Sequence, residues 1–252
     1  MRKIGENAVF GGGIRKWTVL CEKTKEQLYR MCDPGYRDFQ SALIPTGSRD
    51  RVIGVRVPQL RRLARQMVHS GDGMQYLSDS VLPHETYDED NLHAFLIEGI
   101  AGFDACMAEL ERFLPYVDNW ATCDMMAPAA LRTEPEKLLA AVRRWLVSDH
   151  EFTVRYGLVT LMRLLPDSRR PEELLALAAT AAHDGYYVRM AAAWLLSETL
   201  AQRWACAYPY LTSDIFPLWT RKKAIQKALE SRKLTDVQKA RLRALREEMR
   251  TE

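Results

Sequence analysis

Apolar residues along the chain follow the spacing of an α-helix, and strand-like alternation is nearly absent. Pro58 suits a first helical turn, and apolar side chains follow it at i, i+3, i+4 and i+7. These are Leu60, Leu63, Ala64 and Met67. Thr235 and Gln238 form a capping-box pattern that predicts the start of a last helix. The pattern predicts an all-α protein whose helices are separated by recurrent prolines.

An internal repeat in the sequence indicates how the predicted helices are arranged. Pro-Glu-Lys-Leu-Leu-Ala at 135–140 recurs 36 residues later as Pro-Glu-Glu-Leu-Leu-Ala at 171–176. Each copy predicts a first helix, and each is followed by a second helix that begins with an aromatic and a basic residue. We expect these second helices to begin near residues 152–155, 186–189 and 219–221, with a related one at 116–118.

A two-helix unit that repeats every 32–37 residues is typical of an α-solenoid, in which pairs stack because none buries its apolar face alone. We expect a HEAT-like α-solenoid of stacked antiparallel helix pairs with a concave groove. The small/large signature of a tetratricopeptide array is not evident. Residues 1–20 are expected to form a flexible extension, and residues 21–252 a single HEAT-like repeat domain.

In such a stack the second helices lie side by side, so residues near their N-termini line one groove. Those expected in the groove are Trp120, Asp124, Arg155, Arg189, Trp194 and Lys223. Trp120 and Asp124 are spaced i, i+4, which places both on one helix face. The alternative is an ordinary packing tryptophan beside an aspartate that bonds a neighbouring amide.

Composition excludes several other classes of protein. Apolar residues make up 47% of the 252 residues, yet no run approaches the roughly 20 that a membrane span needs. The N-terminus lacks the apolar core of a secretory signal, so we expect a cytoplasmic protein. We also expect a monomer with no membrane partner. The five cysteines and five histidines show neither C-x-x-C nor H-E-x-x-H spacing, so we expect no disulfide framework and no metal. Neither a Walker loop nor a Rossmann glycine motif occurs, and no cofactor is expected.

The net charge of +3 hides an uneven distribution, because basic residues crowd positions 221–250. A basic stripe is the electrostatic footprint of a polyanion binder, although a solvated helix face or a soluble C-terminal cap would also explain it. The residues we expect to contact DNA are Arg56, Tyr187, Arg189, Arg221, Lys222, Lys223 and Lys227.

The sequence Asp-Asn-Trp-Ala-Thr-Cys-Asp at 118–124 resembles the Asp-Asn-Trp-x-x-x-Asp signature of the AlkD-type DNA alkylation repair family, HEAT-like alkylpurine DNA glycosylases. The resemblance extends to 54–61, 152–155, 186–194 and 224–229, and so covers roughly residues 36–250. Thr-Cys at 122–123 and the Arg-Lys-Lys run at 221–223 differ from the expected pattern and indicate a divergent branch.

The resemblance implies excision of N3- and N7-alkylated purines from duplex DNA without base flipping. Asp124 would then be the catalytic carboxylate, and Trp120 and Trp194 the groove indoles. Arg155 would be the basic residue that faces the DNA backbone. No metal or other cofactor is implied.

The residue types suit that chemistry. An N-alkylated purine is already cationic and departs without an added proton. A carboxylate can stabilise the positive charge that develops on the deoxyribose and orient the attacking water. Indole faces can hold the cationic nucleotide, and an arginine can grip a phosphate. Two other hypotheses stay open: a non-catalytic solenoid that binds DNA or a protein, and an RNA binder.

Other conspicuous residues are expected to serve the fold. The acidic run Asp88, Glu89 and Asp90 suits a helix N-terminus, where the helix dipole favours negative charge. Trp219 is expected to pack between repeats. Of Tyr186 and Tyr187, we expect one to face the groove and the other the core.

Overall fold

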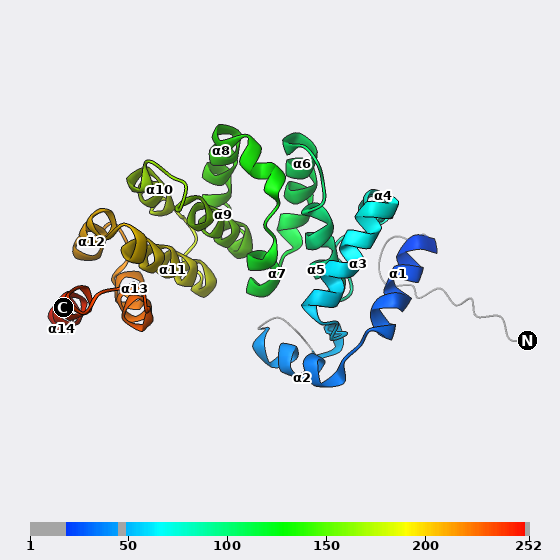
Figure 1. Cartoon of the computed structure of the whole chain (residues 1–252), viewed down its shortest axis with the longest axis horizontal. Helices are drawn as coiled ribbons and strands as arrows, with labels where there is room; N and C mark the ends of the chain where they lie inside the picture. The colour runs from blue at the N-terminus through cyan, green and yellow to red at the C-terminus, as the bar shows by residue number, and fades with distance from the viewer. Residues whose placement is uncertain (1–18, 45–48, 250–252) are drawn as a thin grey trace, which may run out of the picture. The chain divides into compact units, whose positions relative to one another are not determined.

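A computed structural model of the chain describes residues 19–44 and 49–249. Within those ranges the structure contains fourteen α-helices and three short 3-10 helices, with no strand (Figure 1). The all-α prediction is confirmed for this part of the chain. Residues 1–18 of the expected flexible extension lie outside the described residues, and α1 begins at Val19.

The chain divides into two compact units, the first ending at Ala101 and the second beginning at Gly102. The prediction of one repeat domain over residues 21–252 stays a prediction. The first unit contains α1 (Val19–Arg30), α2 (Pro34–Leu43), η1 (Arg49–Arg51), α3 (Val57–Ser70), α4 (Asp72–Asp79) and α5 (Tyr87–Ile97). The second contains α6 (Phe103–Phe113), η2 (Leu114–Tyr116), α7 (Trp120–Met125), η3 (Ala129–Thr133), α8 (Pro135–Leu146), α9 (Glu151–Leu164), α10 (Pro171–Ala178), α11 (Tyr186–Gln202), α12 (Trp204–Thr212), α13 (Leu218–Glu230) and α14 (Asp236–Glu248).

Local signals in the sequence set many of these helix starts. A proline occupies the first turn of α3, α8 and α10, where its missing N–H costs nothing. The predicted capping box of α14 is confirmed: the Thr235 hydroxyl accepts from the backbone N–H of Gln238, and the Gln238 side chain accepts from that of Thr235. The apolar stripe of α3 is buried as expected.

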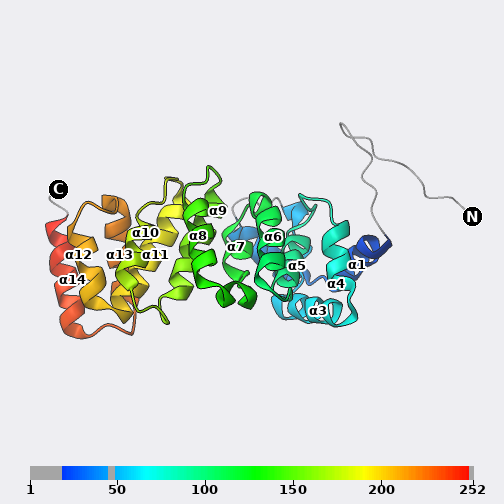
Figure 2. The same ribbon diagram turned by 90° about the horizontal axis from the view of Figure 1, so that it is seen from above.

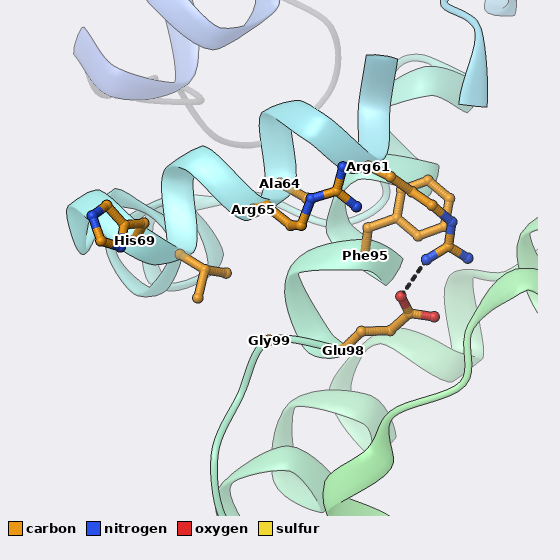
Figure 3. A pocket seen from close by; sticks show the side chains of 8 residues that line it. Arg61, Ala64, Arg65, His69, Phe95, Glu98 and Gly99 are labelled. Carbon is orange, nitrogen blue, oxygen red and sulfur yellow. Dashed lines mark hydrogen bonds and ion pairs between the residues drawn. The ribbon is translucent and has the colours of Figure 1, made fainter. Parts of the chain in front are cut away.

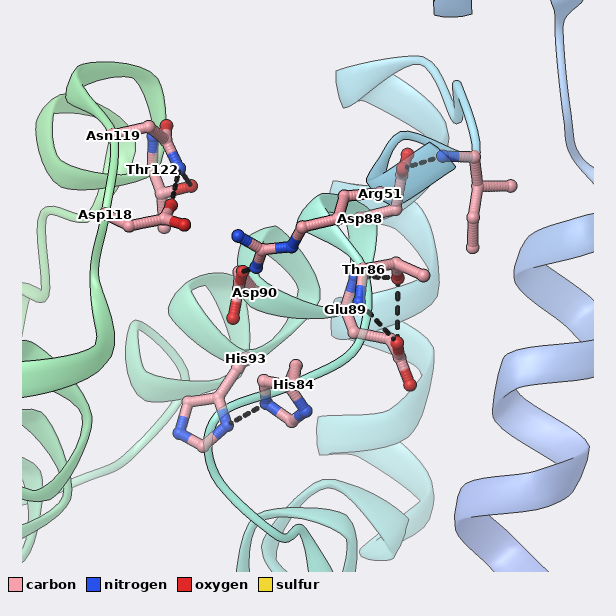
Figure 4. A network of polar contacts seen from close by, with 11 residues as sticks. Arg51, His84, Thr86, Asp88, Glu89, Asp90, His93, Asp118, Asn119 and Thr122 are labelled. Carbon is pink, nitrogen blue, oxygen red and sulfur yellow. Dashed lines mark hydrogen bonds and ion pairs between the residues drawn. The ribbon is translucent and has the colours of Figure 1, made fainter. Parts of the chain in front are cut away.

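The acidic side chains at the start of α5 are buried, which a favourable interaction with the helix dipole alone does not require (Figure 4). The buried carboxylate of Asp88 accepts three backbone N–H groups, from Ile53 at 2.7 Å, Gly54 at 3.2 Å and Val55 at 2.7 Å. Burial raises the pKa of Asp88, and these N–H groups lower it, leaving it above its usual value. The carboxylate thus accepts the hydrogen bonds of backbone N–H groups in an irregular segment, where no helical carbonyl is available to them.

The rest of this polar network is also buried in the first unit. Glu89 closes a capping box with Thr86, and Asp90 accepts from Arg51 at 3.2 Å. Two buried imidazoles, His84 and His93, share a hydrogen bond of 2.9 Å between Nε2 and Nδ1 (Figure 4). These contacts fix α5 to the segments around it.

A hollow of about 500 Å³ lies between α3 and α5 in the first unit (Figure 3). Its polar rim includes Arg61, which donates to Glu98 at 2.6 Å and lies over the Phe95 ring at 4.0 Å. Arg65 and His69 continue the basic edge along α3 (Figure 3).

In the second unit, α9 packs against α11 and α11 packs against α13 (Figures 1 and 2). The intervening helices cover this row: α8 packs on α9, α10 on α9 and α11, α12 on α11 and α13, and α14 on α13. The shared core is aliphatic, with fully buried side chains that include Val154, Leu158, Leu195, Ile225 and Ala228. The predicted alternation of first and second helices is therefore present from α8 to α13.

The structure corrects the expected helix start at residues 116–118. Pro115 lies in the short 3-10 helix η2, and the chain then runs extended through Val117 to Asn119. The helix begins at Trp120, because the Asn119 side chain caps it by accepting from the Thr122 N–H at 2.9 Å (Figure 4). Trp120 therefore occupies the first turn of a short helix that carries Asp124 in its last turn.

Candidate functional site

The centre of the candidate site is an ion pair between Asp124 on α7 and Arg155 on α9. Arg155 donates from Nε to Oδ1 at 2.9 Å and from Nη2 to Oδ2 at 2.6 Å. This is the parallel two-bond geometry that a planar guanidinium makes with a carboxylate. The Arg155 side chain is 7% exposed and that of Asp124 is 16% exposed. Burial lowers the pKa of Arg155, but the hydrogen bonds and charge of Asp124 outweigh it and keep the guanidinium protonated.

Backbone contacts fix the helix that carries Asp124. Arg163, two turns beyond Arg155 on α9, donates to the carbonyl of Asp124 and, at 2.8 Å, to that of Met126. The Cys123 thiol, which is buried, donates to the carbonyl of Phe152 at 3.5 Å. The last turn of α7 is therefore bonded to both ends of α9.

Arg155 also reaches the third helix of the site. Its Nη1 donates to the Tyr187 carbonyl at 2.8 Å, while the Glu151 carboxylate accepts from the Tyr187 N–H at 2.7 Å. A Cβ at Gly185 would overlap the Glu151 carboxylate, so any larger residue there would require that side chain to shift. One guanidinium thus connects α7, α9 and the first turn of α11.

Three residues of the site were not predicted from the sequence: Arg163, Glu151 and Gly185. Arg163 lies eight residues after Arg155 on α9, a spacing that suggests a shared helix face, but nothing in the sequence identifies its carbonyl partners. Glu151 and Gly185 act through a contact between segments 34 residues apart, which no local pattern encodes.

The structure places the two predicted indoles differently. Trp120 lies one turn before Asp124 on α7, as the i, i+4 spacing predicts, and its side chain is partly exposed. Trp194 is also partly exposed, but it lies seven residues beyond Tyr187 on α11, about 10 Å further along the helix axis. Within the described residues, no hydrogen bond or ring contact joins the Trp194 side chain to Asp124 or Arg155.

Two arginines expected to meet a phosphate are buried instead. Every nitrogen of the Arg155 guanidinium donates inward, to Asp124 or to Tyr187. Arg221 is 7% exposed and donates to Asp214 at 2.8 Å and to the carbonyls of Phe216 and Leu211. In this structure both arginines connect helices to one another, because each guanidinium is already paired with a carboxylate and donates its N–H groups to protein acceptors.

The other predicted contact residues keep exposed surface. Arg56, in the first unit, pairs with Asp33 at 2.7 Å and lies over the Tyr36 ring. The side chains of Arg189, Lys222, Lys223 and Lys227 are partly exposed on α11 and α13.

Four aromatic rings, Phe152, Tyr187, Tyr186 and Trp219, form a continuous row at the starts of α9, α11 and α13. We name this the ring row. Successive ring centroids are 5.3, 5.2 and 6.1 Å apart. The Arg189 guanidinium lies 4.9 Å from the Trp219 centroid and the Lys223 ammonium 5.8 Å from it. Trp219, which the sequence analysis assigned to packing, is partly exposed, and Tyr186 is 52% exposed.

An all-helical protein with a positioned carboxylate beside rings and cations fits the class that the sequence resemblance predicted. Residues 24–228, which are 205 of the 252 residues, match the family model described as DNA alkylation repair enzyme. The chain therefore belongs to this DNA repair family. A comparison with curated proteins finds no significant match.

Two further features of the described residues bear on the site. No group of three or more His, Cys, Asp or Glu side chains in the described ranges is arranged to hold a metal ion. In those same ranges, every helix is too short or too polar to span a bilayer.

Proposed function

We propose that this chain is an alkylpurine DNA glycosylase, built as a HEAT-like array that binds duplex DNA along α9, α11 and α13. It would hydrolyse the N-glycosidic bond of cationic N3- and N7-alkylated purines. The observation that carries the proposal is the Asp124 carboxylate, which is paired with Arg155 and still partly exposed, in a chain of the DNA alkylation repair family. Arg163 fixes the backbone carbonyl of the same residue.

Asp124 would stabilise the positive charge that develops on the deoxyribose as the purine leaves, and would orient the attacking water. A carboxylate offers about four lone-pair sites, and Arg155 uses two of them. The remaining sites serve the substrate and the water. Arg155 acts as a positioning residue, because all of its guanidinium nitrogens donate to Asp124 or to the Tyr187 carbonyl.

The departing base is already cationic, so the proposal requires neither a general acid nor a cofactor. Excision without base flipping also requires no pocket for a flipped base. We expect the indole of Trp120, one turn before Asp124, to hold the cationic nucleotide by a cation–π contact, and that of Trp194 to contact the DNA two turns beyond Tyr187 on α11. The DNA backbone would be bound by exposed cations of α11 and α13, which are Arg189, Lys222, Lys223 and Lys227.

The test is to incubate the protein, in excess, with methylated duplex DNA and to quantify released 3-methyladenine and 7-methylguanine by chromatography. Release above background is expected, with a loss of at least about a hundredfold for Asp124→Asn. Asp149→Asn is the matched control, since that exposed aspartate precedes α9 and lies outside the ion pair. Absence of base release from the wild type refutes the proposal. If Asp124→Asn releases the bases as well as the wild type does, Asp124 is not the catalytic carboxylate.

One observation favours a second candidate, a non-catalytic module that binds DNA or a protein. Both oxygens of Asp124 accept from Arg155, as in an ion pair that only joins helices. This candidate predicts DNA binding with a steep inverse salt dependence and no base release. Failure to bind any duplex at about 50 mM salt would favour a protein partner.

A further inference from the structure

The ring row presents one aromatic side chain in a fixed orientation at the surface. Tyr186 is 52% exposed, yet its ring is flanked by Tyr187 at an interplanar angle of 86° and by Trp219 at 66°. Edge-to-face contacts of this kind stabilise a ring pair beyond simple burial. An exposed tyrosine held by two neighbours loses little rotational freedom when a flat ligand packs on it.

Unpaired positive charge lies beside these rings. Arg189 is placed over Trp219, and its buried Nε has no hydrogen-bond partner among the described residues. Lys223 lies on the same indole and donates to the neutral side chain of Gln226 at 2.9 Å. In the described ranges neither cation is paired with a carboxylate. Rings with unneutralised cations beside them match a ligand that carries both a flat heterocycle and an anion.

The ring row is connected to the candidate catalytic carboxylate. The backbone of Tyr187 bonds to Arg155 and Glu151, and its ring packs on Phe152. The rings at one end therefore lie beside the Asp124–Arg155 pair, and those at the other end lie beside Arg189 and Lys223.

We infer that Tyr186, supported by Trp219, is a stacking platform for an unpaired nucleobase, with Arg189 and Lys223 binding the phosphates that flank it. The inference deepens the proposed function, since it assumes that DNA binds along these helices. It assigns the protein a preference for duplex DNA that is locally opened, because a paired and stacked base cannot offer its face to a side chain. Stacking of one base on an aromatic side chain corresponds to roughly 5- to 150-fold in affinity.

The experiment measures fluorescence anisotropy of two labelled duplexes of equal length, one fully paired and one with a single unpaired thymidine at its centre. The wild type is expected to bind the bulged duplex about tenfold more tightly. Tyr186→Leu should lose this preference while its affinity for the paired duplex stays within about twofold. Tyr186→Trp, which restores a large ring, should retain the preference.

Tyr208→Leu is the matched control, because Tyr208 lies on α12, outside the ring row, and its loss should leave the preference intact. Arg189→Gln should weaken the binding of both duplexes to the same extent and reduce the salt dependence of the affinity, as the loss of a phosphate contact does. The inference is overturned if the wild type binds the two duplexes equally tightly. It is also overturned if Tyr186→Leu weakens the binding of both duplexes to the same extent. Either result leaves base release from paired duplexes untouched, so failure here is distinct from failure of the glycosylase proposal.

Discussion

The pair Asp124–Arg155 allows a quantitative test of how the site is built. Two charge-assisted hydrogen bonds of 2.9 and 2.6 Å join the side chains, and each such bond contributes about 1.5–3 kcal/mol. Because 16% of the Asp124 side chain stays exposed, water screens part of the interaction. We therefore expect a coupling energy of about 2–4 kcal/mol, between the values for surface pairs and for fully buried pairs.

The perturbation is a double-mutant cycle with Asp124→Asn, Arg155→Met and the double variant, followed by thermal unfolding. Tryptophan emission reports on the second unit, which contains Trp120 and Trp194. Either single variant should lower the melting temperature by roughly 5–12 °C, given about 2–4 °C per kcal/mol for a domain of this size. The double variant should lose much less than the sum of the two, because neither charge is left unpaired.

A surface pair of the same unit provides the matched cycle. Arg132 and Asp167 form an ion pair with side chains that are 55% and 72% exposed, so their coupling should fall in the range of 0–1 kcal/mol. A coupling below about 0.5 kcal/mol for Asp124 and Arg155 would refute the reasoning. It would mean that the carboxylate is held by the backbone contacts of α7 alone.

Three further outcomes are expected. The neutral imidazole of His150 caps α9 by accepting from the Thr153 N–H, and burial lowers its pKa below 6.5. Stability should therefore fall more steeply in the wild type than in His150→Asn, which keeps a cap without titrating, as the pH drops below about 6.5. Parallel pH profiles of the two proteins in urea unfolding would contradict this. Asp88→Asn should destabilise the first unit by about 2–4 kcal/mol in calorimetry, because the NH2 group of the new amide would face at least one of the three buried backbone N–H groups, donor against donor. A loss of less than about 0.5 kcal/mol would count against that account. Gly185→Ala should displace the Glu151 carboxylate, which the added Cβ would overlap, and lower the melting temperature by a few degrees. An unchanged melting temperature would show that the carboxylate moves freely.

The sequence predicted those parts of the fold that depend on local signals. Prolines at 135 and 171 and the capping box at Thr235 mark helix starts that the structure confirms. The i, i+4 spacing placed Trp120 and Asp124 on one short helix. These features are set within a few residues, so their physics is visible in the sequence.

Contacts between helices were harder to predict. Arg189 and Arg221 both follow an aromatic residue at the start of a second helix, yet Arg189 stacks on a partly exposed indole while Arg221 is buried. The difference comes from the acceptors that meet the Arg221 guanidinium. These are Asp214 and the Phe216 carbonyl in the turn before α13, and the Leu211 carbonyl in α12. Likewise the partner of Arg155 lies 31 residues away, and only the packing of α7 on α9 brings it into reach.

The thiol next to the candidate catalytic carboxylate has a consequence for a protein of an alkylation repair family. Alkylating agents attack thiolates as well as purines, and a thiol reacts only to the extent that it ionises and is reached by the reagent. Cys123 is fully enclosed, and burial, followed by the charge of Asp124, raises its pKa far above the neutral range. The motif can therefore carry a cysteine beside Asp124 without being inactivated by the chemicals whose damage the family repairs.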